Sequence, residues 1–182
     1  MTKKDVREKL DFAKRRLNNL LSLIKGKRFG SRPHLRQQLA QEFFFHLIGA
    51  ADVLAQFVNE KRQIGIHSVN VNISNVAQKL KSSDPQLALA IGNLYVNVRT
   101  RPFPAKPYSA NGYLFRAYNY RHQVTHRGRN PFNFKLGGRP QVSFRLDPRD
   151  PRSPLSDKGV EVEMRQMLSL FRKRCESALA RC

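Results

Sequence analysis

Acidic residues are scarce in this chain. Its 182 residues include 34 Lys and Arg but only 13 Asp and Glu, which gives a formal net charge of +21. Between Asp84 and Asp147 there is no acidic residue at all. A two-metal nuclease site or a glycosidase pair needs clustered carboxylates, so this segment excludes both. An excess of positive charge repels itself in a compact state, which indicates a polyanionic partner, with nucleic acid first among the candidates.

Other common features are missing as well. The two cysteines, Cys175 and Cys182, are too few for a disulfide framework or a zinc set and suit a reducing compartment. The N-terminal residues MTKKDVREKL contain no apolar stretch typical of a secretory signal, and the most apolar run, residues 43–58, is too short and polar to cross a bilayer. We therefore expect a cytoplasmic protein that does not enter a membrane. The chain has no P-loop, dinucleotide fingerprint or nucleophile elbow, and we expect no cofactor.

Helical periodicity dominates the chain and predicts a single all-α domain over residues 1–182. Apolar residues recur at helical spacing in six segments, residues 4–25, 33–62, 74–82, 86–99, 109–128 and 156 onward. Residues 131–147 instead alternate around Gly137-Gly138, which is typical of a small β-hairpin, and a Pro-rich linker follows to about residue 155. The predicted fold is a bundle of about four long helices with a hairpin inserted before the last. We expect Phe43, Phe44 and Phe45 in its core.

The acid-free segment also contains many aromatic residues, among them Tyr108, Tyr113, Tyr118 and Tyr120. Basic and aromatic residues together are typical of a surface that contacts phosphates and stacks on bases. The alternative is that helix packing brings acidic residues from elsewhere, Glu42, Asp52 or Glu60, to neutralise this segment.

The stretch YNYRHQVTHRGRNPF, residues 118–132, concentrates Arg121, His122, His126 and Arg127 near a predicted helix end. RNA can be cleaved without a metal when its 2′-hydroxyl attacks the adjacent phosphorus. The protein must then transfer protons, which histidine does near neutral pH, and stabilise a phosphorane, which a guanidinium does bidentately. The residues RHQVTH include both groups.

Residues 121–126 resemble the R-x(4–6)-H motif of the HEPN superfamily of helical ribonucleases, and His122 fits the polar position after the arginine. The resemblance implies an antiparallel four- or five-helix bundle that forms a homodimer with a composite active site. It implies that Arg121 binds the scissile phosphate, that His126 is the general acid/base, and that His122 orients the pair or contacts the RNA backbone. It also implies a toxin or defence role, with an antitoxin or other inhibitor protein as a partner.

Three further arginines, Arg116, Arg127 and Arg129, are predicted to follow the phosphate backbone of the RNA. Some HEPN toxins have a modifiable tyrosine two residues after the histidine, but this chain has Gly128 there. Regulation by modification of that tyrosine is therefore not expected. Glu42 is a possible partner of Arg121, or else a solvent-facing partner of His46 on the same helix.

Other readings of these residues remain open. The chain could be a non-catalytic RNA- or DNA-binding module, which explains the charge equally well, or a basic adaptor for an acidic protein. His122 and His126 have the i, i+4 spacing of a metal-binding pair, but no Cys, Asp or Glu lies near them in the sequence. We therefore predict no metal site.

Overall fold

The computed structural model of the chain describes residues 1–25, 33–97, 106–126, 133–135 and 141–182. These residues form six α-helices, one 3-10 helix and two short strands. In chain order the elements are α1 (Lys3–Lys25), α2 (Pro33–Lys61), η1 (Ser68–Asn70), α3 (Ile73–Leu80), α4 (Pro85–Gly92), α5 (Ala110–His126), β1 (Asn133–Lys135), β2 (Gln141–Ser143) and α6 (Val160–Leu179). The predicted all-α bundle with a hairpin before the last helix is confirmed.

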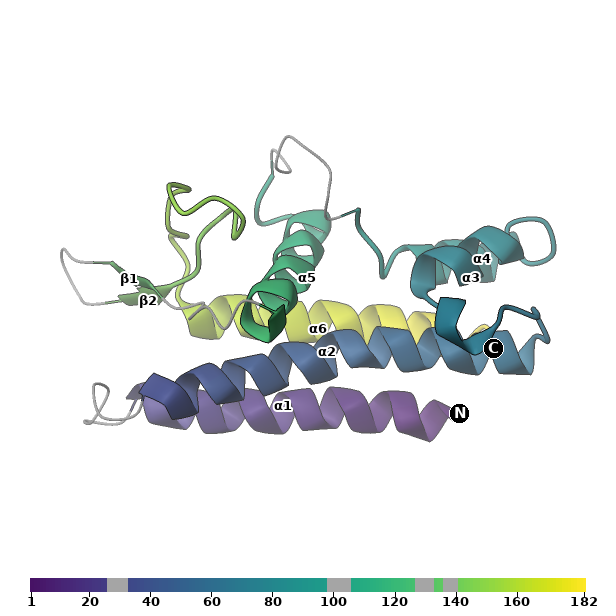
Figure 1. Cartoon of the computed structure of the whole chain (residues 1–182), viewed down its shortest axis with the longest axis horizontal. Helices are drawn as coiled ribbons and strands as arrows, with labels where there is room; N and C mark the ends of the chain where they lie inside the picture. Colours follow the sequence, from purple (N-terminus) through teal and green to yellow (C-terminus); the bar gives the residue numbers. More distant parts are fainter. Residues whose placement is uncertain (26–32, 98–105, 127–132, 136–140) are drawn as a thin grey trace.

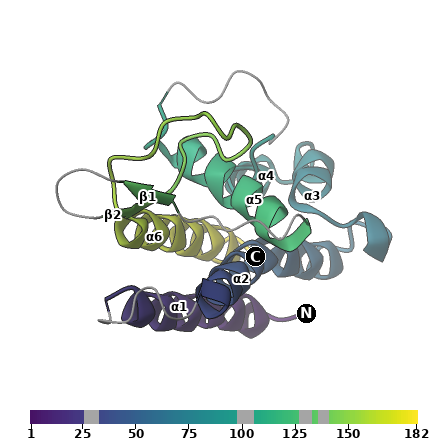
Figure 2. The same cartoon turned by 60° about the vertical axis from the view of Figure 1, so that its left-hand side comes forward.

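Helices α1, α2 and α6 lie side by side along the long axis of the molecule, and α5 crosses them at a steep angle (Figure 1). Helix α1 is antiparallel to α6, because Lys25 pairs with Glu161 at one end while Lys3 donates to the Leu179 carbonyl at the other. The short helices α3 and α4 lie together to one side of α5 (Figures 1 and 2).

Apolar stripes on the long helices form the core. The inward side chains of α1 recur every three or four residues and are all buried: Val6, Leu10, Ala13, Leu17 and Leu20. Those of α6 follow the same rule: Val160, Met164, Met167, Phe171, Cys175 and Leu179. Burial of this apolar surface at helical spacing holds the layers together. Cys175 is fully buried on this stripe, and burial raises the pKa of its thiol to about 12.

Helix α2 is the most deeply buried of the long helices, but not on every side. Phe43 and Phe44 are fully buried, and the Phe44 ring stacks on Tyr120 of α5. Phe45 is 46% exposed, so its predicted place in the core is wrong. Three consecutive helical positions span about 200° of the helix surface, and only two of these three rings can therefore face the bundle.

The short helices begin where polar side chains cap them. Asp84 accepts from the Leu87 amide at the start of α4, as its position before Pro85 predicts. Helix α3 is capped by Asn72, whose side chain accepts from the Asn75 amide, and it begins at Ile73, one residue before the expected start. Helix α4 ends at Gly92, earlier than the expected residue 99. After this point a backbone carbonyl accepts a hydrogen bond from a side chain instead of continuing the helix, because Tyr118 donates to the Leu94 carbonyl at 3.0 Å.

The predicted hairpin is present, with Phe134 opposite Val142 in an antiparallel pair. The Pro-rich segment that follows is not the extended linker expected. It folds back on itself, since the Leu146 amide donates to the Pro154 carbonyl and the Ser156 amide to the Phe144 carbonyl. Ser156 is used in this closure, and α6 therefore begins later than predicted, at Val160.

Helix α5 starts under a tight steric constraint. The Ser109 hydroxyl accepts from the Gly112 amide, as an N-cap does, and the chain before it turns sharply back over the helix. A Cβ on Gly112 would lie 2.3 Å from the Pro107 carbonyl oxygen. Only glycine allows the turn to close against the helix at this position.

Gly112→Ala is expected to destabilise the protein by about 2–3 kcal/mol, because backbone atoms must move to admit the methyl group. The matched control is Gly49→Ala in α2, whose nearest neighbour would be a flexible lysine carbon at 3.9 Å. This second change should stabilise by about 0.5–1 kcal/mol through helix propensity. Urea unfolding of both variants measures the difference, and equal effects of the two would contradict the steric argument.

Candidate functional site at the end of helix α5

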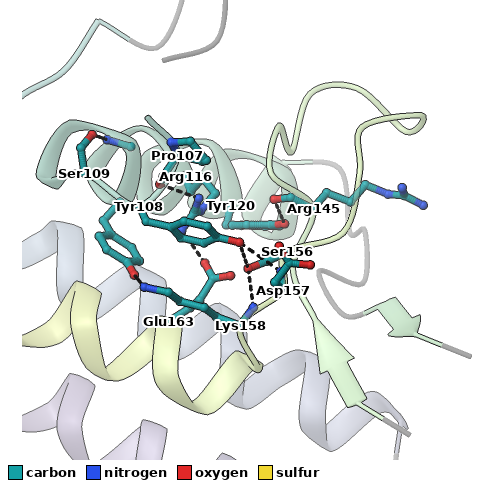
Figure 3. Close-up of polar contacts among 12 residues, drawn as sticks. Pro107, Tyr108, Ser109, Arg116, Tyr120, Arg145, Ser156, Asp157, Lys158 and Glu163 are labelled. Carbon is teal, nitrogen blue, oxygen red and sulfur yellow. Dashed lines mark hydrogen bonds and ion pairs between the residues drawn. The ribbon is translucent and has the colours of Figure 1, made fainter. Parts of the chain in front are cut away.

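Helix α5 is anchored at its middle by a buried ion pair. The Arg116 guanidinium donates to the Glu163 carboxylate of α6 at 2.6 Å and to the Pro107 carbonyl at 2.7 Å, and both charged side chains are fully buried (Figure 3). Burial raises the pKa of the Glu163 carboxyl, and the Arg116 charge opposes that rise. A buried charge needs such partners, because an unpaired one is costly to desolvate.

Aromatic rings and a second cation surround the pair. The Arg116 guanidinium lies 5.5 Å from the Tyr108 ring centroid and 5.0 Å from that of Tyr113. Lys158 lies over the Tyr108 ring and donates to the Tyr113 hydroxyl at 3.1 Å. The Tyr108 hydroxyl shares a hydrogen bond with Ser156 (Figure 3). These contacts tie the turn before α5 to the start of α6 and so set the direction of α5.

The prediction that Arg116 follows an RNA backbone is wrong, because its side chain is fully buried on Glu163. Glu163 was missed as its partner, although the sequence offers a signal. Glu163 lies on the inner stripe of α6 between Val160 and Met164, and an acidic residue on an apolar stripe requires a buried cation.

Arg121 lies toward the end of α5, where the helix returns to the surface. Its side chain is 33% exposed, and its guanidinium is 3.4 Å from the Asp52 carboxylate of α2, which is 44% exposed. The suggested pairing with Glu42 is wrong, because Glu42 binds Arg16 at 2.7 Å instead. Glu42, Asp52 and Glu60 are the three acids considered as neutralising partners of the acid-free segment, and among the described residues Asp52 is the one that pairs with an arginine of that segment.

The remaining predicted residues lie at or beyond the end of α5. His122 is exposed, next to Arg121. His126 is the last residue of the helix, and its side chain is outside the described part of the structure, as are Arg127 and Arg129 altogether. Positions five apart on a helix point about 140° from each other, so Arg121 and His126 share a cleft only where the helix loosens or a second surface completes it.

Asp52 and Arg121 form a polar pair at the edge of the core. Partial burial raises the pKa of the Asp52 carboxyl, and the Arg121 charge opposes this rise. Tyr118, three residues before Arg121 on α5, has its pKa raised by burial and by the Asp52 charge. The 3.4 Å contact is long for a charged hydrogen bond, so an anion with better geometry can compete for the guanidinium.

Two common functional features are absent from the part of the chain that the structure describes. No three His, Cys, Asp or Glu side chains within this part of the chain come together as metal ligands. None of its helices has both the length and the apolar character needed to span a bilayer.

Comparison of the chain with models of known protein families, with curated proteins and with solved structures gives no match.

Removing one member of the buried Arg116–Glu163 pair should lower the free energy of unfolding far more than removing one member of an exposed ion pair. We expect Glu163→Ala to lower the free energy of unfolding by about 3–5 kcal/mol, since it leaves the Arg116 charge buried and unpaired. Glu176→Ala, which breaks the exposed pair with Arg7, should cost no more than about 1 kcal/mol. Denaturant titration of both variants tests this contrast; a loss of less than about 1 kcal/mol for Glu163→Ala would show that the pair does not anchor α5.

Proposed function

We propose that this protein is a metal-independent endoribonuclease that uses an Arg/His pair and the 2′-hydroxyl of its RNA substrate. The observation that carries the proposal is the position of Arg121: its guanidinium is partly exposed toward the end of α5, five residues before His126, the final residue of the helix. The arginine and the histidine that 2′-hydroxyl chemistry requires therefore both lie in the last six residues of α5.

Arg121 binds the scissile phosphate in this proposal. Its contact with Asp52 is long and partly exposed, and such pairs contribute at most about 1 kcal/mol. A phosphodiester offers two oxygens to the guanidinium fork and can replace the carboxylate. Asp52 then acts as a placeholder that keeps Arg121 extended toward the surface when RNA is absent.

His126 transfers the protons. In the composite cleft, the neutral His126 imidazole of one copy accepts the proton of the attacking 2′-hydroxyl, and the His126 imidazolium of the second copy, which the macrodipole favours at the last position of a helix, protonates the leaving 5′-oxygen. His122, exposed beside Arg121, orients the pair or contacts the RNA backbone. Arg127 and Arg129 follow directly in the sequence and extend the positive charge along the bound strand.

Two partners besides RNA belong to the proposal. The wide angular separation of Arg121 and His126 on α5 is compensated when a second copy of the chain contributes its own pair to a composite cleft. An antitoxin or other inhibitor protein, and a toxin or defence role in the cytoplasm, follow only from the HEPN resemblance.

A second function is favoured by the Asp52 contact itself. Arg121 already has a carboxylate partner, Asp52. If this ion pair only stabilises the fold, Asp52 stays bound to Arg121 when RNA is present, and Arg121 does not take part in catalysis. The protein would then be a non-catalytic RNA- or DNA-binding module, with its net charge of +21 providing the affinity.

Cleavage of a mixed RNA pool in EDTA separates the two functions. The wild type should cut and leave 2′,3′-cyclic phosphate ends, while DNA of the same sequence stays intact because it has no 2′-hydroxyl. Arg121→Ala and His126→Ala should each lower the rate by about 10²- to 10⁴-fold. His67→Ala, at an exposed position on the loop before η1, is the matched control and should cut normally. Full activity of His126→Ala would refute the catalytic assignment, and retention of RNA without cleavage by all four proteins would favour the binding module.

Asp52→Asn should strengthen nucleic-acid binding, because it removes the anion that competes with phosphate for Arg121. We expect a gain in affinity of up to about fivefold, in line with the loss of one exposed pair worth at most about 1 kcal/mol. Asp11→Asn changes the net charge equally but releases Arg172, so it is the control. Filter binding of an RNA oligonucleotide measures both variants, and equal gains would mean that only net charge matters.

A further inference from the structure

Exposed aromatic rings line the outer face of α1 and α2, the two helices that run side by side at one edge of the molecule (Figures 1 and 2). Phe12 of α1 is 38% exposed and Phe45 of α2 is 46% exposed. His46 lies between them: its ring stacks on Phe12 with a centroid distance of 5.2 Å and an interplanar angle of 20°, and it meets the Phe45 ring edge to face at 5.4 Å. The three side chains form one row, which we call the aromatic row.

Flexible cations cover this row. The Arg15 guanidinium lies 4.3 Å from the Phe12 ring centroid, and the Lys9 ammonium lies 5.3 Å from that of Phe45. In a protein–protein interface, apolar neighbours cover an aromatic ring and exclude water from it. Here charged groups cover the rings, and these groups can move into solvent. Cation–π contacts at exposed sites are weak compared with the stacking of a nucleic-acid base on an aromatic ring.

A hollow opens beside Phe12. It has a volume of about 330 Å³ and is lined by Phe12, Arg15, Arg16, Asn18 and Asn19. Such a volume lies at the lower end of the range for small-ligand sites. The lining combines a ring face that can stack on a base, the Arg15 guanidinium that can bind a phosphate, and two side-chain amides that can hydrogen-bond a base edge; Arg16, the second arginine, is paired with Glu42.

We propose that the aromatic row binds single-stranded RNA, with bases stacking on Phe12 and Phe45 and the phosphates bound by Arg15 and Lys9. An incoming base replaces the cation over each ring, and the released cation then pairs with the adjacent phosphate. Single strands are required, because the bases of a duplex are stacked on one another and present no free face.

The row leads toward Arg121. Phe45, Gly49 and Asp52 follow one another on the same face of α2, and a Cβ on Gly49 would lie 3.9 Å from the Lys9 side chain. Burial raises the pKa of Asp52, which pairs with Arg121, and the Lys9 charge is near enough to oppose that rise together with Arg121. From Phe45 to Asp52 the helix rises about 10 Å, or roughly three base steps of a strand. This last step rests on the proposed function: a strand held on the row would present a nearby phosphate to Arg121.

The chain contains no tryptophan, so Phe12→Trp places a single fluorophore in the row while keeping a stacking ring. We expect its fluorescence to be quenched on titration with a single-stranded DNA oligonucleotide in EDTA. DNA is the probe because it lacks the 2′-hydroxyl and reports binding without cleavage. A blunt DNA duplex of equal length should quench little. Leu89→Trp, on the exposed face of α4, is the control and should show no quenching.

Alanine variants test the energetic role of the row. Phe12→Ala and Phe45→Ala should each weaken single-strand binding by about fivefold to tenfold and leave the salt dependence unchanged, because no phosphate contact is lost. Lys9→Ala and Arg15→Ala should each lower the salt slope by about one. Tyr95→Ala removes a ring of similar exposure, 42%, that packs on Tyr118 rather than on the row, and this variant should bind normally.

Three results would overturn the proposal. The first is wild-type single-strand affinity in the Phe12→Ala, Phe45→Ala double variant. The second is equal quenching of the tryptophan by single strand and duplex. The third is a change in oligomeric state of the double variant, measured by sedimentation, with binding intact, which would make the row a protein interface. If wild type binds single strands through the row but never cuts RNA, the inference stands and the nuclease proposal fails.

Discussion

The buried Arg116–Glu163 ion pair determines where α5 lies. It joins two residues 47 positions apart, with a donor–acceptor distance of 2.6 Å and no exposure of either side chain. Tyr108, Tyr113 and Lys158 close around it and tie the turn before α5 to the start of α6. Because a charge cannot be buried without this geometry, the pair permits one placement of α5, and that placement brings Arg121 to the surface beside Asp52.

The scarce acidic residues are largely used to join helices. Asp11, Glu161 and Glu176 pair α1 with α6 through Arg172, Lys25 and Arg7, so this seam is close to neutral. Among the described residues, Arg121 at the end of α5 and Lys9 and Arg15 over the aromatic row carry positive charge outside this seam. The proposed RNA contacts lie in these two places, which α2 connects. This distribution accounts for a chain that remains compact despite a net charge of +21.

Much of the bundle could be predicted from local patterns. The buried stripes of α1 and α6 recur at three and four residues, and Asp84-Pro85 and Ser109 mark helix starts by capping chemistry that depends only on near neighbours. The candidate site was predicted less well. Arg116 and Arg121 are similar in sequence context, both in an acid-free segment among tyrosines, yet one is fully buried and the other reaches solvent. Only the angular position of each residue relative to α6 and α2 separates them.

The sequence by itself determined the helical class, the order of the elements, the hairpin before the last helix and the concentration of Arg and His near residue 121, because periodicity, capping and composition are local properties. Tertiary structure decided which charges meet. It paired Arg121 with Asp52 rather than Glu42, buried Arg116 on Glu163 and left Phe45 outside while Phe43 and Phe44 entered the core. These outcomes depend on the relative rotation of packed helices, and that rotation is set by the sum of long-range contacts rather than by any one segment.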